Sequence, residues 1–237
     1  MNPIAVFQHS PNVDPGYFAS FLDAQNIPWQ HIRVDQGDTI PDSPVPFSGL
    51  CFMGGVMSVN DPLPWIPEAL RLIQQAVEAG IPVIGHCLGG QLLSKALGGI
   101  VARNPAPEIG WGRVSVAKNP VSTHWFGELE DFSAFHWHGD GFSVPAGATQ
   151  LLTNPHSANQ AFAQGPHLGM QCHVEMTEEL IRTWNQEWST QTLQCVSYPE
   201  SVQPTSLQLA QMPVNLPAMR SIAHRLYVRW LENVRTD

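Results

Sequence analysis

The stretch IPVIGHCLGGQLLSKALGG, residues 81–99, joins two different patterns. Its first part is a short β-branched run bounded by a proline, which predicts a buried strand over Ile81–Gly85. Its second part repeats leucine and alanine at helical spacing, which predicts an amphipathic helix from Leu88. Cys87 is therefore expected at a strand-to-helix corner, between glycines.

The sequence before this corner alternates strand and helix patterns. The expected elements are strands Ile4–Gln8, Trp29–Val34 and Gly49–Met53 and helices Pro15–Gln25 and Trp65–Ala79. Such alternation predicts crossover connections and a mostly parallel sheet covered by helices on both faces. The predicted fold class is therefore α/β.

After Gly99 the sequence changes to shorter strand-like pieces separated by Gly, Pro and Asn turns. They are Gly112–Ala117, Phe135–Trp137, Thr149–Thr153, Gln160–Ala163 and Gly169–His173, followed by helices at Thr177–Trp188 and Ala218–Val234. The strand-like pieces are expected to add a β-rich edge to the sheet. The Pro- and Gln-rich stretch Tyr198–Pro217 is interpreted as a wrapped connection. We expect a single domain over residues 1–237, with residues 190–237 as a wrapping extension.

Composition narrows the function classes. With 11 basic and 20 acidic residues, the chain has a formal charge of -9, which argues against nucleic acid as a partner. No segment reaches the ~18 apolar residues of a membrane span, and the N-terminus lacks the pattern of a signal peptide. Four widely spaced cysteines fit a reducing compartment. We therefore expect a cytoplasmic protein with no membrane association.

The corner has the features of a nucleophile site. Ligands of open α/β sheets bind beyond the carboxyl ends of the strands, where Cys87 is expected. The pattern G-x-C-x-G resembles the G-x-S-x-G elbow of hydrolases, and the N-terminus of the following helix favours a thiolate and offers the N–H of Leu88 to an oxyanion. The alternative is that Cys87 is a small buried hydrophobe and that the glycines only permit tight packing.

A base for this cysteine is found in the segment GMQCHVE, residues 169–175. His173 and Glu175 are two residues apart at a predicted strand end, so both side chains project to the same side. The imidazole can then transfer a proton while the carboxylate orients the ring. Because the chain has 10 histidines, a chance His-x-Glu pair is the alternative.

Four segments in order resemble the class I (triad-type) glutamine amidotransferase family. They are CFMGGVMSVND, GHCLGGQLL, HWHGDGFSVPAGA and GMQCHVE, and the likeness extends over about Ile4–Trp184. Within the family the chain resembles stand-alone proteins similar to the amidotransferase domain of GMP synthase and to plant γ-glutamyl peptidases. The resemblance implies a flavodoxin-like fold and a small-molecule substrate, and we expect no cofactor.

The resemblance also implies roles for the catalytic residues. Cys87 matches the nucleophile that attacks the side-chain amide of glutamine, which gives a γ-glutamyl thioester and ammonia. His173 and Glu175 match its proton-transfer partners. Gly55 matches an oxyanion-hole residue, together with the N–H of Leu88.

The same resemblance implies substrate-binding residues, namely Gly54, Gln91, His138 and Asp140. The chain also departs from the family pattern. Val56 replaces a proline after the two glycines, so we expect a less rigid loop there. Val174 replaces another proline between His173 and Glu175. Gly90 stands where many relatives have histidine, which we interpret as the loss of a side chain beside the pocket.

Three functions remain open at this point. The leading hypothesis is a glutamine amidohydrolase or amidotransferase that releases ammonia. Because the sequence has no GxxxxGK[ST] loop, either a partner synthetase or acceptor protein holds the ammonia acceptor site, or there is no acceptor. The first alternative is a γ-glutamyl peptidase or hydrolase that acts on a peptide or conjugate. The second is a non-catalytic binding or regulatory module with the same fold.

Several other histidines, cysteines and tryptophans are expected to have structural roles. His124, His136 and His138 resemble part of a metal cluster, but the sequence shows no fourth ligand, so we expect no metal. Cys51 and Cys172 are expected in the core. Trp184 and Trp188, at i and i+4 of one predicted helix, favour core packing over a partner surface.

Overall fold

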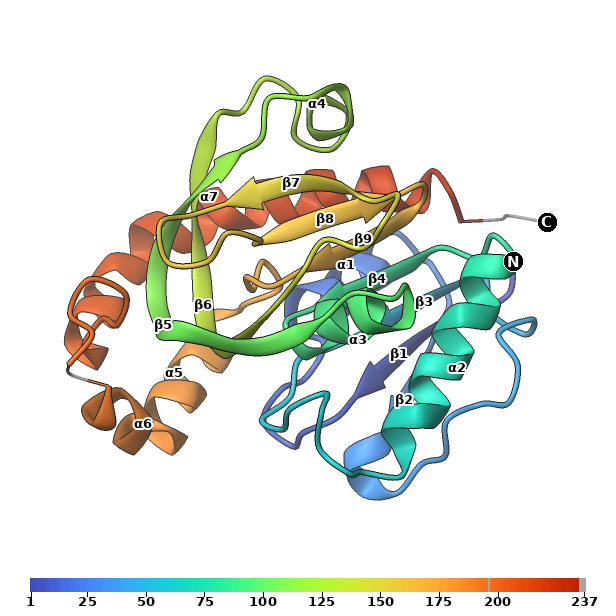
Figure 1. Cartoon of the computed structure of the whole chain (residues 1–237), viewed down its shortest axis with the longest axis horizontal. Helices are drawn as coiled ribbons and strands as arrows, with labels where there is room; N and C mark the ends of the chain where they lie inside the picture. The colour runs from blue at the N-terminus through green and yellow to red at the C-terminus, as the bar shows by residue number, and fades with distance from the viewer. Residues whose placement is uncertain (196, 235–237) are drawn as a thin grey trace.

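The computed structural model describes residues 1–195 and 197–234. A single nine-stranded sheet extends through the molecule (Figure 1). Its strands are β1 (Ile4–Gln8), β2 (Trp29–Arg33), β3 (Gly49–Phe52), β4 (Val83–His86), β5 (Val101–Val116), β6 (Asp131–Phe142), β7 (Thr149–Thr153), β8 (Ala161–Gln164) and β9 (His167–Met170). The order across the sheet is β2-β1-β3-β4-β9-β8-β7-β5-β6. The α/β fold class expected from the sequence, with a β-rich edge added to a sheet that begins as parallel, is confirmed.

The sheet has a parallel part and an antiparallel part. Strands β2, β1, β3, β4 and β9 pair in parallel, and β9, β8, β7, β5 and β6 pair antiparallel. Strand β9 follows far later in the sequence but lies beside β4, with Met170 opposite His86. The residues that follow β4 and β9 therefore leave the same edge of the sheet side by side.

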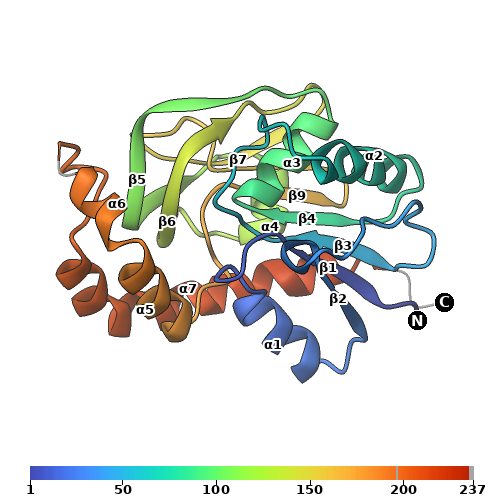
Figure 2. The same cartoon turned by 90° about the horizontal axis from the view of Figure 1, so that it is seen from below.

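Helices cover both faces of the parallel part (Figure 2). The helices of the described residues are α1 (Gly16–Ala24), α2 (Trp65–Glu78), α3 (Leu88–Ala96), α4 (Pro120–Phe126), α5 (Glu178–Glu187), α6 (Ser189–Gln194) and α7 (Thr205–Leu231), with a 3-10 turn at Val34–Gln36. Helices α2 and α3 lie on one face, and α1, α5 and α7 lie on the other. Among the described residues, no helix combines the length and apolar character needed to cross a membrane.

The buried side chains form two clusters, one on each face of the sheet. The first packs α1, α5 and α7 against the sheet and includes the largest side chains, such as Trp184, Tyr227 and Trp230. The second packs α2 and α3 through Leu72, Leu92 and similar residues. Alternate residues of β1, β3 and β4 contribute to opposite clusters, which explains why these strands read as continuous apolar runs.

Two expectations about the second half of the chain were wrong. The first strand there is much longer than Gly112–Ala117, because β5 begins at Val101 and continues through the proline-containing segment with a register shift between Arg103 and Glu108. The last helix begins at Thr205 rather than at residue 218. It contains Pro213 and Pro217, which are exposed on one face, while buried residues such as Met212, Leu216 and Met219 hold the opposite face on the sheet.

Candidate active site

Cys87 occupies a strained corner between β4 and α3. Its backbone has φ 52° and ψ -107°, a left-handed conformation that a non-glycine residue adopts at a cost of about 1–3 kcal/mol. The flanking glycines allow the strand and helix to touch. A Cβ on Gly85 would lie 2.3 Å from the backbone of Gly89, and a Cβ on Gly89 would lie 1.9 Å from the carbonyl oxygen of Phe52. The corner therefore holds Cys87 at the edge of the sheet by backbone packing.

His173 and Glu175 lie just beyond the end of β9. Residues 171–175 are not part of the strand, but the N–H of His173 donates to the carbonyl of Phe135 at 2.8 Å, which bridges this segment to β6. The ring Nδ1 of His173 lies 2.6 Å from Glu175 Oε1. Both side chains are buried, so the carboxylate fixes the ring through its Nδ1–H.

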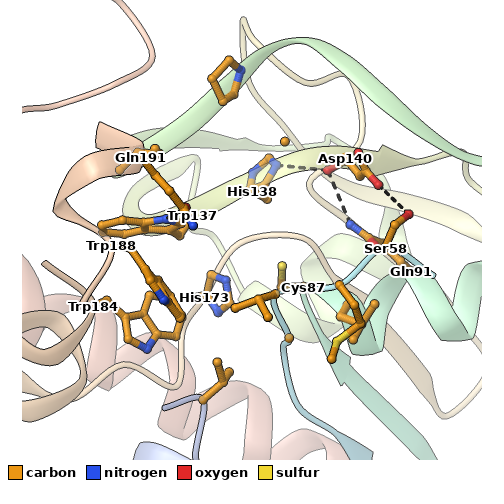
Figure 3. Close-up of a pocket in the computed structure, with 18 of the residues that line it drawn as sticks. Ser58, Cys87, Gln91, Trp137, His138, Asp140, His173, Trp184, Trp188 and Gln191 are labelled. Carbon is orange, nitrogen blue, oxygen red and sulfur yellow. Dashed lines mark hydrogen bonds between the residues drawn. The ribbon is translucent and has the colours of Figure 1, made fainter. Parts of the chain in front are cut away.

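The ring of His173 also lies beside Cys87. Its second nitrogen, Nε2, is buried and has no hydrogen-bond partner among the described residues. A Cβ added at Gly54 would lie 3.2 Å from His173 Cε1 and 3.7 Å from Cys87 Cβ, so both side chains contact the same small space. Figure 3 shows the ring of His173 next to Cys87 at the base of the pocket.

The charges around His173 favour an imidazolium. Burial lowers the pKa of His173, but the negative charges of Glu175 and Cys87 outweigh it and raise the pKa to about 10. Burial raises the pKa of Glu175, but the charges of His173 and His86 and the hydrogen bond from His173 lower it overall. A buried carboxylate thus holds a positively charged imidazolium beside Cys87.

The segment Gly54–Val56, which we call the oxyanion loop, lies over this corner. Gly55 and Leu88 both line the pocket, and Leu88 is the first residue of α3, so its N–H has no acceptor within the helix. The N–H of Val56 donates to Ser10 Oγ at 3.2 Å. A proline at position 56 has no N–H and could not make this bond. The expected loosening of the loop is therefore offset by a contact that the substitution itself permits.

The side chain of His9 contacts the backbone at the start of the same loop. Its side chain is buried, its Nδ1 lies 3.1 Å from the carbonyl oxygen of Met53, and its ring stacks on Trp65 with 4.8 Å between centroids. Burial lowers the pKa of His9 to about 4, because a charged ring would be desolvated there. His9 is thus a neutral support for the loop.

A cavity of about 360 Å³ opens above Cys87. Its walls include the predicted residues Gly55, Cys87, Leu88, Gln91, His138, Asp140 and His173. The other two predicted residues do not line the cavity. Glu175 binds the ring of His173, and Gly54 lies next to both His173 and Cys87. The structure thus brings all nine predicted site residues to one place, seven of them in the cavity wall.

Hydrogen bonds fix the polar wall of the cavity. Gln91 Nε2 donates to Gln171 Oε1 at 3.2 Å and lies 3.5 Å from the carbonyl oxygen of Asp140. The carboxylate of Asp140 accepts from Ser58 Oγ at 2.9 Å, and His138 Nδ1 lies 3.2 Å from the Asp140 carbonyl (Figure 3). The guanidinium of Arg103 stands 4.0 Å from the other Asp140 oxygen at the open rim. This wall presents charged and polar groups suited to the polar end of an amino acid.

Gln171, which no sequence pattern indicated as a site residue, contacts Cys87 directly. Its Nε2 lies 3.5 Å from Cys87 Sγ. Gln171 leaves β9 beside Cys87 because β9 and β4 are parallel neighbours, and the N–H of Cys87 donates to Met170 in the same register. Only the strand order, which the sequence does not display, places it there.

An aromatic wall made by Trp137, Trp184 and Trp188 was also missed as part of the pocket. Trp184 is buried, as expected, and its ring packs edge-on against His173 with 4.9 Å between centroids. Trp137 packs against both other tryptophans, and all three line the cavity (Figure 3). The core role predicted for Trp184 is thus combined with a role in shaping the site.

Three further sequence interpretations have an outcome. Cys51 and Cys172 are buried core residues, and burial raises the pKa of each thiol well above its ordinary value, as expected for unreactive cysteines. The interpretation of Gly90 was wrong. A Cβ at Gly90 would lie 2.4 Å from the carbonyl oxygen of Met170, so this glycine permits α3 to pack on β9 and opens no space beside the pocket.

Comparisons with known proteins agree with this arrangement. The family model described as glutamine amidotransferase class-I matches residues 24–183. The crystal structure of a glutamine amido transferase from Methylobacillus flagellatus is 38% identical, covers 100% of this chain and 97% of its own, and superposes with a TM-score of 0.97. The glutamine amidotransferase-like protein YfeJ of Salmonella typhimurium is 32% identical over 65% of this chain and 67% of its own. GMP synthase of Thermomicrobium roseum is 33% identical over 54% of this chain, but that match spans only 23% of the GMP synthase chain.

The fold and the comparisons define an α/β enzyme of the amidotransferase type. The chain belongs to the class I glutamine amidotransferase family.

Proposed function

We propose that the protein hydrolyses the side-chain amide of glutamine through a thioester on Cys87 and releases ammonia. The observation that carries this proposal is the row Glu175, His173, Cys87, in which one ring nitrogen is bound at 2.6 Å and the other is left for the nucleophile. A row with this order is the arrangement that cysteine acyl transfer requires.

In the proposed reaction the Cys87 thiolate attacks the carbonyl carbon of the substrate amide. The oxygen becomes negatively charged and accepts hydrogen bonds from the N–H groups of Gly55 and Leu88, each of which would contribute about 2.7–4 kcal/mol. The C–N bond then breaks, and His173 gives its proton to the departing nitrogen. Water, deprotonated by His173, cleaves the thioester and restores Cys87, with glutamate as the second product.

The polar wall gives the substrate its orientation in this proposal. Asp140 offers a carboxylate to the α-ammonium group, and Arg103 offers a cation to the α-carboxylate at the rim. Gln91 and His138 line the same side of the cavity. An ammonia acceptor would lie on a separate synthetase, and otherwise the ammonia is released.

The test is a measurement of glutamate and ammonia from glutamine, with Cys87→Ala as the inactive control. A glutamine-like electrophile should add to Cys87, and mass spectrometry of the digested protein should find Cys51 unmodified. Equal modification of Cys51 and Cys87, with no turnover of any γ-glutamyl compound, would favour the non-catalytic binding module instead.

The aromatic wall favours a second candidate, a γ-glutamyl hydrolase that acts on an amide with a larger amine. The leaving group must pass His173, and the surface next to His173 is formed by Trp184 and its neighbours. Ammonia needs no apolar surface, and a cavity of about 360 Å³ lies in the range of sites that hold drug-sized ligands. Glutamate release from γ-glutamyl-phenylalanine but not from glutamine would select this candidate. Trp188→Ala should then raise KM for the peptide, because Trp188 lines the cavity without touching the acid–base pair.

A further inference from the structure

Two histidines and a glutamate converge beside the pocket, on strands β5 and β6. Glu108 of β5 is the register partner of His138 of β6, and His136 lies two residues earlier on β6. All three side chains are buried, with exposed fractions of 3% or less. One ligand atom from each residue lies within 4.8 Å of the other two.

The nitrogens and oxygens of this cluster face one another across a small gap. His136 Nδ1 and His138 Nε2 are 3.4 Å apart. Glu108 Oε1 is 3.5 Å from His138 Nε2, and Glu108 Oε2 is 3.8 Å from His136 Nδ1. The two ring nitrogens are within hydrogen-bond distance of each other, whereas the carboxylate distances are too long for good hydrogen bonds, so neither ring holds the carboxylate of Glu108.

Other residues hold each group from behind. The carboxylate of Glu108 accepts from the side-chain amides of Gln160, at 2.7 Å, and Asn154. His138 Nδ1 donates to the carbonyl of Asp140, which leaves Nε2 with a lone pair toward the gap. Such outer contacts, which fix the tautomer and the carboxylate, are typical of metal ligands.

The space for the ring of His136 depends on Gly112. A Cβ at Gly112 would lie 3.0 Å from His136 Nε2, so only glycine leaves room for the ring to turn Nδ1 toward Glu108. This Nε2 is a buried nitrogen with no hydrogen-bond partner among the described residues. The ring of His136 on β6 therefore presents Nδ1 to the cluster, although its Nε2 has no hydrogen-bond partner among the described residues.

We propose that Glu108, His136 and His138 form a zinc-binding site. Two histidines and one glutamate are a donor set that binds zinc with an open fourth position. Zinc–nitrogen and zinc–oxygen distances of about 2.0–2.2 Å place tetrahedral ligands roughly 3.3–3.6 Å apart, whereas octahedral neighbours would be about 3 Å apart. The separations of 3.4 Å between the two ring nitrogens and 3.5 Å between His138 Nε2 and Glu108 Oε1 fall in the tetrahedral range, whereas the 3.8 Å separation involves the other carboxylate oxygen and lies just above it.

Zinc at this site would connect β5 to β6 and hold His138 at the pocket wall. The expectation of no metal rested on the histidines alone, since the sequence shows no further ligand near them. Glu108 is more than twenty residues away from them in the sequence and meets them only through strand pairing. The site is independent of the thioester chemistry proposed for Cys87.

The experiment measures zinc binding in the Cys87→Ala protein, so that the nucleophile cannot bind the metal. The metal-free protein is titrated with zinc against a chromophoric chelator and separately with Co²⁺, whose visible absorption reports tetrahedral coordination. We expect one zinc per chain and an intense tetrahedral cobalt spectrum. His136→Asn should weaken zinc binding by about 100-fold or more, and Asn154→Ala, which removes only an outer contact, by about 10- to 100-fold.

His124→Asn is the matched control, because His124 is an exposed histidine on α4. It should bind zinc like the Cys87→Ala parent. Thermal unfolding without metal shows whether each variant is folded, and Asn154→Ala keeps the test valid if His136→Asn is not. The proposal is overturned if the parent protein binds no zinc, gives no tetrahedral cobalt spectrum, or binds zinc equally with and without His136.

Discussion

Replacing Glu175 with glutamine should remove the positive charge of the His173 ring while the ring keeps its position. Glutamine retains an oxygen that can accept the Nδ1–H bond, which is 2.6 Å long in the native protein, but it carries no negative charge. An unpaired imidazolium in a buried site costs about 3–5 kcal/mol, so the ring should lose its proton instead. Burial is the largest single influence on this pKa. The pKa of His173 should therefore fall from about 10 to near or below its ordinary value of 6.5.

The loss of this charge has a consequence for stability that depends on pH. A histidine with a raised pKa contributes stability that is fully present below pH 6.5 and is lost as the pH rises through about 10. Within this window one proton changes the free energy of unfolding by up to about 1.4 kcal/mol per pH unit. As the pH rises through this window, the native protein should therefore lose up to this much free energy of unfolding per pH unit compared with Glu175→Gln. In a separate assay at pH 7, kcat/KM should be about 10²- to 10⁴-fold lower in the variant.

The measurements are urea unfolding at several pH values between 7 and 10 and an NMR titration of the labelled histidine ring. Glu178→Gln is the matched control, because Glu178 is 61% exposed and pairs with Arg182 on the surface of α5. Its loss should change stability by less than about 1 kcal/mol at any of these pH values. If Glu175→Gln retained a His173 pKa near 10 and the native slope, the charge pairing inferred for this site would be refuted.

Three other substitutions test the packing around the nucleophile. Gly89→Ala should destabilise the protein by about 3 kcal/mol or more, since the new Cβ would lie 1.9 Å from a β3 carbonyl, whereas Gly147→Ala should cost only about 1 kcal/mol in urea unfolding. Equal costs would contradict the close approach. Gln171→Leu should slow alkylation of Cys87 by about tenfold, because the hydrogen bond that Gln171 donates to the sulfur is lost, and an unchanged rate would exclude a role for that contact. Ser10→Ala should lower kcat/KM about tenfold with little change in KM, because the oxyanion loop loses its 3.2 Å anchor, and a change in KM alone would indicate a role in binding instead.

The parallel half of the fold could be predicted closely from the sequence. Strands β1, β3 and β4 are buried on both faces, so apolar residues form short runs with clear ends, and β1 matches the predicted Ile4–Gln8. Helix α2 has apolar residues at regular helical spacing and lies within one residue of its predicted range. In these elements local pattern and tertiary burial favour the same structure.

The antiparallel half was predicted less well because its strands contain local signals against strand formation. The segment Asn104-Pro-Ala-Pro107 reads as a turn, yet it is part of β5, where the register shift accommodates it beside β6. Pro213 and Pro217 likewise read as helix breakers. They are four residues apart on the exposed face of α7, where the missing N–H groups are compensated by a long buried face on the other side. In both cases tertiary contacts outweigh the local preference.

The candidate site divides in the same way. Cys87 and Gly89 carry a local signal, because a strained corner with no room for a side chain requires these residue types in this spacing. The contacts of Gln171 and Glu108 carry none, because they arise where β9 lies beside β4 and β5 beside β6. The oxyanion loop combines both kinds of information. Its altered sequence suggested a loose loop, but Val56 gains an N–H that Ser10, from the end of a different strand, can bind. A departure from a family motif therefore has to be judged with the residues that the sheet places opposite it, since the lost constraint can be replaced from there.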